Sequence, residues 1–169
     1  MTLRESLIAF ACTLGLVSTP ALADFNSASA SSDANATVQT AIGISNTAAL
    51  NFGGVVAGGT TGTVVLTAGG SRSSTGGTTL GSSSSVSVAS FTVTGDANAT
   101  YGITLPASTS ITSGANSMTV DTFTSNPSGT GTLNGSGSQT LSVGATLNVG
   151  ASQAAGSYTG SFSVSVAYN

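Results

Sequence analysis

A two-residue alternation of apolar and polar side chains runs through this chain and constrains its fold more than any other feature. Near the C-terminus, Tyr158, Phe162, Val164, Val166 and Tyr168 alternate with small and hydroxyl residues. Successive side chains of a strand point to opposite faces, so this pattern predicts half-buried strands. Near the start of the chain the even positions are Ala28, Ala30, Ala34, Ala36, Val38, Ile42, Ile44, Ala48, Leu50 and Phe52.

Between these two regions, segments rich in Val, Thr and aromatic residues predict further strands. They cover 64–67, 86–94, 101–105, 118–123 and 141–149, and the first strand of the domain is expected at about 41–52. Gly and Ser clusters are expected to separate them, at Gly53-Gly54, Gly58-Gly59, Gly69-Gly70, Gly76-Gly77, 82–85 and 129–137. Apolar residues with helical spacing are absent after residue 23, and no repeat of fixed period is present. The pattern therefore predicts an all-β fold, an antiparallel immunoglobulin-like β-sandwich.

The N-terminus has the pattern of an export signal. Arg4 lies in a short polar start, 6–17 is almost wholly apolar, and Ala21-Leu22-Ala23 resembles a signal-peptidase site. The apolar stretch is too short for a membrane span, which needs about 20 residues. We expect a Sec-type signal peptide over 1–23, cleavage between Ala23 and Asp24, and a secreted or cell-surface protein that passes through the periplasm. Transmembrane segments are not expected after cleavage.

Charged side chains are scarce, with two Lys or Arg and five Asp or Glu in 169 residues. A nucleic-acid surface needs clustered Lys or Arg, so nucleic acid is not expected as a partner. The single Cys, Cys12, lies within the predicted signal, so the mature chain has none for a disulfide. Burial and backbone hydrogen bonds must therefore stabilise the domain.

The same scarcity argues against catalysis. The chain has no His, and residues 24–169 contain neither Lys, Glu nor Cys to serve as a base or nucleophile. Asp96 and Asn98 offer too few oxygens for a calcium loop, and their place after a predicted strand favours a turn. Arg72 is expected to be a solvated loop residue. We expect no enzyme activity, catalytic residue, cofactor or metal site.

Several stretches carry a family resemblance. They are Leu50-Asn51-Phe52-Gly53, 63–66, 89–95, Tyr101-Gly102-Ile103-Thr104-Leu105-Pro106, 118–120, 143–147 and Gly156-Ser157-Tyr158-Thr159-Gly160. In this order they resemble a family of exported bacterial proteins known as domain of unknown function 4402, over about 36–169. That family is in turn similar to the spore coat U domain, which includes the subunits of archaic chaperone–usher pili.

The resemblance implies a pilin-like sandwich that lacks one strand and takes it from a neighbouring copy. It implies donor-strand residues Phe25, Ala28, Ala30, Ala34, Ala36 and Val38, within an N-terminal extension over 24–38 that precedes a domain over 39–169. Chaperone recognition would fall on the C-terminal strand, at Gly156, Tyr158, Phe162, Val164, Val166 and Tyr168. The implied partners are further copies joined head to tail, a periplasmic chaperone and an outer-membrane usher.

Two functions stay open on the sequence. One is a filament subunit that assembles by donor-strand complementation. The other is a self-contained monomeric sandwich, at the cell surface or secreted, that acts as an adhesion or binding module. In the second case residues 24–34 form a leader, and the domain's own first strand begins near Val38.

Overall fold

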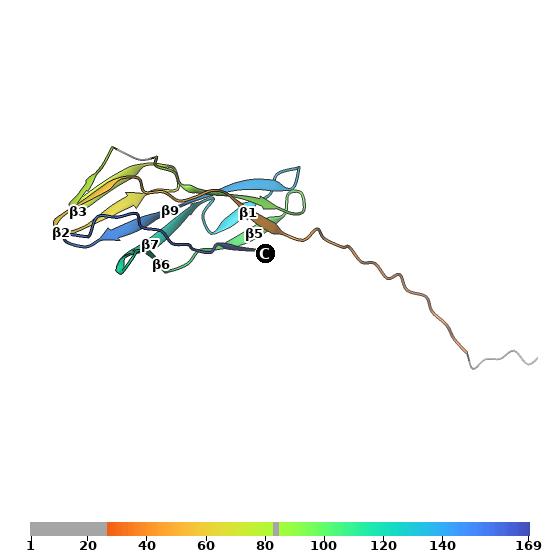
Figure 1. Cartoon of the computed structure of the whole chain (residues 1–169). Coiled ribbons are helices and arrows are strands. Elements are labelled where there is room, and N and C mark those ends of the chain that lie inside the picture. The colour runs from red at the N-terminus through yellow and green to blue at the C-terminus, as the bar shows by residue number, and fades with distance from the viewer. Residues whose placement is uncertain (1–26, 83–84) are drawn as a thin grey trace, which may run out of the picture. The chain divides into compact units, whose positions relative to one another are not determined.

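The computed structural model describes residues 27–82 and 85–169 (Figure 1). The chain divides into two compact units, 1–37 and 38–169. Within the first unit, the described residues 27–37 form no strand and all are exposed. The sequence-based boundary, after Val38, differs from this division by one residue.

Ten strands and no helix form in the described residues, and all strand pairs are antiparallel. The strands are β1 (Gly43–Ala48), β2 (Val55–Leu66), β3 (Arg72–Leu80), β4 (Ala89–Thr94), β5 (Thr100–Thr104), β6 (Ser108–Ser113), β7 (Asn116–Asn126), β8 (Thr130–Thr132), β9 (Ser138–Val149) and β10 (Ser165–Tyr168). The larger sheet has the order β1-β4-β9-β2-β3, with β7 also paired to β9 and β6 to β7. The smaller sheet has the order β10-β5-β8. The predicted all-β, antiparallel sandwich is confirmed.

Strand β9 is the centre of the larger sheet (Figure 1). Its first half pairs with β4 and its second half with β2. Strand β7 pairs with residues that β4 and β2 also pair with, so β7 lies along the opposite edge of β9. Strands β2 and β4 thus follow one another along a single edge, and the sheet branches at β9.

The apolar core has two parts, which differ in how they are covered. One part packs between the sheets, where Tyr101 of β5 meets Val93, Leu141 and Val143 of the larger sheet, with Leu133 beside them. The other part contains no residue of the smaller sheet. Its buried members are Phe52, Val64, Leu66, Val120, Ala145, Leu147 and Val149. The smaller sheet therefore covers only one half of the inner face.

The first and last strands are shorter than the sequence predicts. The first strand ends at Ala48, after a register shift against β4, and only an isolated bridge from Asn51 to Ser87 follows. At the C-terminus only Ser165–Tyr168 forms a strand, although the alternation begins at Tyr158. The segment before it has a single bridge, Thr112 to Thr159, because it lacks a continuous strand partner.

Two of the predicted glycine separators are wrong. Gly58-Gly59 lies inside β2 and Gly76-Gly77 inside β3, where the pairing register shifts between Ala57 and Gly62. A Cβ on Gly77 would lie 2.2 Å from the Thr60 carbonyl oxygen, so the two backbones approach too closely for a side chain there. These glycines allow a bend within a hairpin rather than ending a strand. The predicted separator 129–137 likewise contains β8.

The described residues contain no helix that is long enough and apolar enough to cross a membrane.

Candidate functional site: an apolar groove beside the C-terminal segment

A groove of about 1160 Å³ opens along the second part of the core. One bank is formed by residues 49–57, which lead into and begin β2. The other bank is formed by 153–162, the segment that precedes β10. We call these the β2 bank and the C-terminal bank. The groove thus lies between segments from opposite ends of the domain.

Core side chains form the floor of the groove. Ile111 of β6, Met118 and Val120 of β7, and Leu147 and Val149 of β9 all line it. Val120, Leu147 and Val149 are at most 3% exposed, so solvent hardly reaches this part of the floor. These residues belong to the core half that the smaller sheet leaves uncovered.

Backbone groups on both banks lack a full set of strand partners. Val55–Ala57 pairs with β3 along one edge, whereas β9 pairs with β2 only from Gly62 onward. In the C-terminal bank, Thr159 exchanges two hydrogen bonds with Thr112, at 2.9 and 3.0 Å. Beyond this bridge the bank has no strand pairing. Unpaired strand edges of this kind favour the addition of another strand.

The groove carries no charge. Its lining includes Asn46, Asn51, Thr109 and Gln153, but no Asp, Glu, Lys, Arg or Cys. The described residues contain no group of three His, Cys, Asp or Glu that could hold a metal ion. The chemistry available in the groove is therefore apolar burial and hydrogen bonding.

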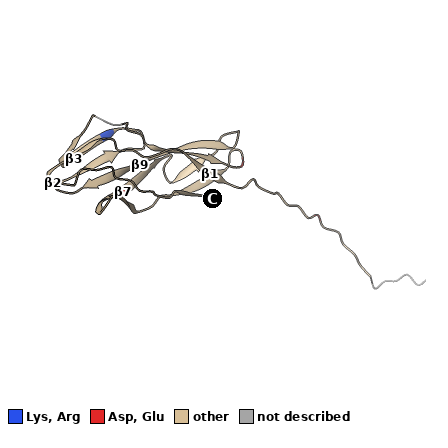
Figure 2. Cartoon of the chain, in the orientation of Figure 1, with Lys and Arg blue, Asp and Glu red and all other residues tan. Residues whose placement is uncertain are grey.

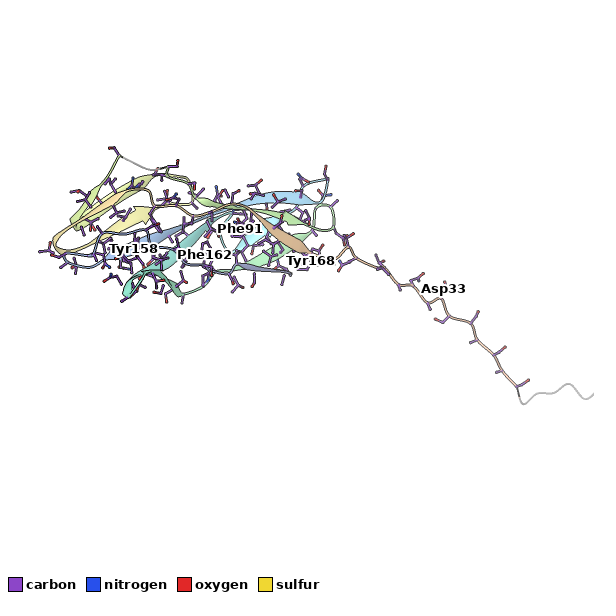
Figure 3. All side chains as sticks on the ribbon, viewed as in Figure 1. Asp33, Phe91, Tyr158, Phe162 and Tyr168 are labelled. Carbon is purple, nitrogen blue, oxygen red and sulfur yellow. The ribbon has the colours of Figure 1, made fainter. Side chains whose placement is uncertain are left out.

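The structure separates the six predicted C-terminal residues into two sets, and Figure 3 labels Tyr158, Phe162 and Tyr168 among them. Gly156, Tyr158 and Phe162 line the groove. Val164, Val166 and Tyr168 are half-buried and pack against the covered core half. Phe162 closes one end of the groove, with its ring centroid 4.9 Å from that of Phe123 and 6.4 Å from that of Phe91.

Tyr158 is held by its hydroxyl group. This hydroxyl donates to the Ala154 carbonyl at 2.7 Å and accepts from the Gln153 amide at 2.8 Å. The hydroxyl therefore stabilises a turn within the C-terminal bank. The aromatic ring is half-buried and lines the groove.

The residues predicted to form the donor strand do not contribute to this groove within the described chain. Ala28, Ala30, Ala34 and Ala36 are exposed, and Val38 is 95% exposed, the most exposed of the large apolar side chains described. Phe25 lies outside the described residues. Thr40, two residues after Val38, is the first residue of this region with a long-range hydrogen bond.

Tyr168 anchors the beginning of the domain to its end. Its hydroxyl donates to the Thr40 carbonyl at 2.8 Å and accepts from the Asp96 N–H at 2.7 Å. Asp96 in turn accepts from the Thr40 N–H at 2.8 Å. Hydrogen bonding by the Thr40 side chain and backbone lowers the pKa of the Asp96 carboxyl. Three residues far apart in sequence thus form one cluster, the Thr40–Asp96–Tyr168 clamp.

The predicted turn at Asp96 and Asn98 is present. Strand β4 ends at Thr94, and Asn98 has a positive φ of 61° before β5 begins. The link from this turn to Tyr168 was not predicted, because only the fold brings these positions together. A Cβ on Gly95 would lie 2.2 Å from the Tyr168 hydroxyl, so the clamp requires glycine there.

The prediction for Arg72 is wrong. It is half-buried in β3 and is the one Lys or Arg among the described residues (Figure 2). Its guanidinium donates to the carbonyl oxygens of Gly54, in the β2 bank, and of Gly81. Arg72 therefore holds the backbone of this bank in place instead of being solvated.

These features define an antiparallel β-sandwich domain with an apolar groove between its first and last segments. The family model described as Domain of unknown function (DUF4402) matches residues 42–168. The chain belongs to this family, as the sequence resemblance predicts. The matched range contains every strand of the domain. Comparison with curated proteins found no match, and comparison with solved structures found none either.

Proposed function

We propose that this protein is an exported structural subunit of a surface filament, in which the N-terminal extension of one copy fills the groove of the next. The observation that carries the proposal is the open apolar groove between the β2 bank and the C-terminal bank. A strand added there would pair with both banks and lie over the half of the core that the smaller sheet does not cover. This is the donor-strand complementation that the sequence resemblance to pilins implies.

The extension has the properties of a strand that awaits a partner. Residues 27–37 are exposed and form no strand, and their one charged residue is Asp33. The even positions present Ala28, Ala30, Ala34 and Ala36, followed by Val38. Because neighbouring side chains of a strand face opposite ways, these residues would all enter the groove together.

The geometry of such a contact favours a filament. The extension and the groove are different surfaces of the same chain, so the contact is head to tail rather than symmetric. Contacts of this kind propagate unless they close into a ring. We propose further that the signal over 1–23 directs export and that a chaperone covers the groove before assembly. Tyr158 and Phe162 would then be among the residues that the chaperone contacts.

In this proposal only one face of the extension enters the groove. Two variants that carry the same charge on opposite faces of the extension therefore test it. Ala36→Asp would place a carboxylate in the apolar groove, which is costly unless the charge is paired. Thr37→Asp introduces the same charge one residue later, on the opposite face. We expect Ala36→Asp to lower the share of multimers at least tenfold and Thr37→Asp to leave it unchanged.

The measurement is size-exclusion chromatography of the full chain, together with gel electrophoresis in detergent before and after boiling. Multimers joined by strands should survive mild detergent and dissociate on boiling. A variant that lacks 24–38 should remain a folded monomer. Multimers that persist in this deletion variant, or equal losses from both aspartate variants, would contradict the proposal.

A further inference from the structure

The outer face of the larger sheet carries a row of neutral polar side chains, one from each of five neighbouring strands. The pairing registers place them in the order Thr75, Thr63, Asn148, Thr119 and Ser110, from β3 through β2, β9 and β7 to β6. Residues paired directly across a sheet point to the same face. In each of the three central strands a residue adjacent to the row is buried, namely Val64, Leu147 and Val120. Adjacent residues of a strand point to opposite faces, so the row faces outward.

A depression of about 550 Å³ lies over this row. Thr61, Thr63 and Thr75 line one side of it, and Ser117 and Thr119 line the other. Asn148 lies in the floor, and Gln153 closes the end beyond β9. The polar side chains of the depression are all hydroxyls and amides. Met118, Val149 and three glycines complete the lining, and the depression shares Met118, Val149 and Gln153 with the groove.

Two amide oxygens in the depression are fixed in orientation and are free to accept hydrogen bonds. The Asn148 amide nitrogen donates to the Asp121 carboxylate at 2.8 Å and to the Thr119 carbonyl at 3.4 Å. The Gln153 amide nitrogen donates to the Tyr158 hydroxyl at 2.8 Å and to the Ser117 carbonyl at 3.3 Å. All four partners accept, so each amide must present its oxygen on the other side. Within the described chain, neither oxygen receives a hydrogen bond.

Hydroxyl groups supply the complementary donors. Thr63 and Thr75 share one hydrogen bond at 2.7 Å between their hydroxyl oxygens. One hydroxyl of this pair uses its hydrogen for the other, which leaves the second hydrogen available to a ligand. The depression thus contains amide oxygens that are fixed in orientation and can accept hydrogen bonds, together with a threonine hydroxyl that can rotate and donate one. This combination suits a ligand whose own groups both donate and accept, as sugar hydroxyls do.

The absence of charged side chains in the lining restricts the kind of ligand that the depression can bind. None of the residues that line the depression is charged. An anionic ligand would therefore find no opposite charge, and the nearest carboxylate, on Asp121, lies outside the lining and already accepts from two side chains, Asn148 and Thr122. A protein partner would need an apolar centre for its interface, and the outer row offers none.

We infer that this depression binds a neutral oligosaccharide. The hydroxyls of one or two sugar residues would donate to the Asn148 and Gln153 amide oxygens and accept from the Thr63–Thr75 pair. A small number of placed polar groups is the usual means of orienting such a ligand. The inference does not rest on filament assembly, because none of the residues that bind the sugar belongs to the extension: Thr63, Thr75 and Asn148 lie in the sheet, and Gln153 lies at the start of the C-terminal bank.

The test measures binding of the full chain to an array of neutral gluco-, manno-, galacto- and xylo-oligosaccharides, with sialylated and sulfated sugars alongside. We expect at least one neutral oligosaccharide to bind with a millimolar or tighter dissociation constant. In the double variant Thr63→Val and Thr119→Val this affinity should fall at least tenfold. The variant keeps β-branched side chains, so the strands should still form.

Thr140→Val is the matched control, because Thr140 lies on β9 an even number of residues from Asn148 and is exposed. At about 3.4 Å per residue the two are separated by about 27 Å. This control should bind the sugar as the unchanged protein does, and thermal unfolding should show that all variants fold. No binding to any neutral oligosaccharide, or equal binding by the double variant, would overturn the inference. Self-association that the double variant abolishes would assign the face to a second copy instead.

Discussion

At the residue scale, Arg72 shows how one side chain can replace part of a strand ladder. The 52–54 backbone lies where no strand pairs with it, and the Arg72 guanidinium supplies hydrogen bonds to Gly54 and Gly81 in their place. Hydrogen bonds from a charged donor contribute about 1.5–3 kcal/mol. Removal of the side chain would leave the Gly81 carbonyl without this donor, whereas the Gly54 carbonyl would keep the hydrogen bond from the Gly81 N–H at 2.8 Å.

We therefore expect Arg72→Ala to lower the free energy of unfolding by about 2 kcal/mol. Arg72→Lys should recover only part of this loss, because one ammonium group lacks the planar fork that reaches two carbonyl oxygens. Urea unfolding measures both changes, with Ser73→Ala on the exposed face of the same strand as the control. If Arg72→Ala has the same midpoint of urea unfolding as the unchanged protein, then the hydrogen bonds of Arg72 do not stabilise the domain.

Asp96 gives a prediction about pH. Its pKa is lowered from 3.8 by hydrogen bonding from Thr40, so the folded state favours the carboxylate. The resulting stabilisation is complete above pH 3.8 and declines as the pH falls through the lower pKa of the folded state. In Asp96→Asn this part of the acid dependence should disappear. Thermal unfolding between pH 7 and pH 2 tests it, with Asp33→Asn, outside the domain, as the control. Parallel curves for the unchanged protein and Asp96→Asn would refute the clamp.

At the scale of elements, β9 determines how the larger sheet can pack. Val143 pairs with β4 and Ala145 with β2, so Gly144 lies where these two strands meet end to end. A Cβ on Gly144 would lie 2.2 Å from the Leu66 carbonyl oxygen and 2.5 Å from the Ala68 nitrogen. Both are backbone atoms, so the contact cannot be relieved by a side-chain rotation.

Gly144→Ala should therefore destabilise the domain by about 2 kcal/mol, in the range found for overpacked cores. Gly59→Ala is the matched control, because a Cβ there meets nothing within 4 Å. Thermal unfolding should place Gly144→Ala several degrees below the unchanged protein and Gly59→Ala close to it. Equal midpoints for the two variants would show that the strand junction can shift to admit a methyl group.

The elements also show what could be predicted from sequence. Strands β4, β5 and β9 carry apolar residues at every second position, and β7 does so up to its register shift after Asp121; each was predicted within a few residues of its bounds. Strands β3, β6 and β8 were missed. They are rich in Ser, Thr and Gly, and they lie at or near sheet edges, where backbone pairing to one neighbour suffices and few side chains are buried.

The candidate site was predictable only in part, for the same reason. The alternation at Tyr158 and Phe162 identified side chains of the groove. Its floor could not be predicted, since β6, which carries Ile111, was missed and the pairing of Val120 with Leu147 joins residues far apart in sequence. The clamp from Thr40 to Tyr168 and the polar row from Thr75 to Ser110 likewise exist only once the strand register is known.

At the scale of the whole molecule, the central claim is that the domain needs a strand that its own described residues do not supply. One half of the core is covered by the smaller sheet, and the other half opens into the groove. Adding a strand would bury more apolar surface, at about 25 cal/mol per Å². It would also pair backbone groups on both banks. Assembly would then add to the stability of a domain that already folds alone.

Amide hydrogen exchange tests this claim most directly, since it reports whether backbone groups on the two banks are paired. The comparison is between the assembled full chain and the variant that lacks 24–38. We predict slow exchange at 50–57 and 154–162 in the assembled chain and fast exchange there in the deletion variant, with β9 protected in both. Equal exchange on the two banks in both samples would contradict the account, because it would mean that the extension pairs with neither.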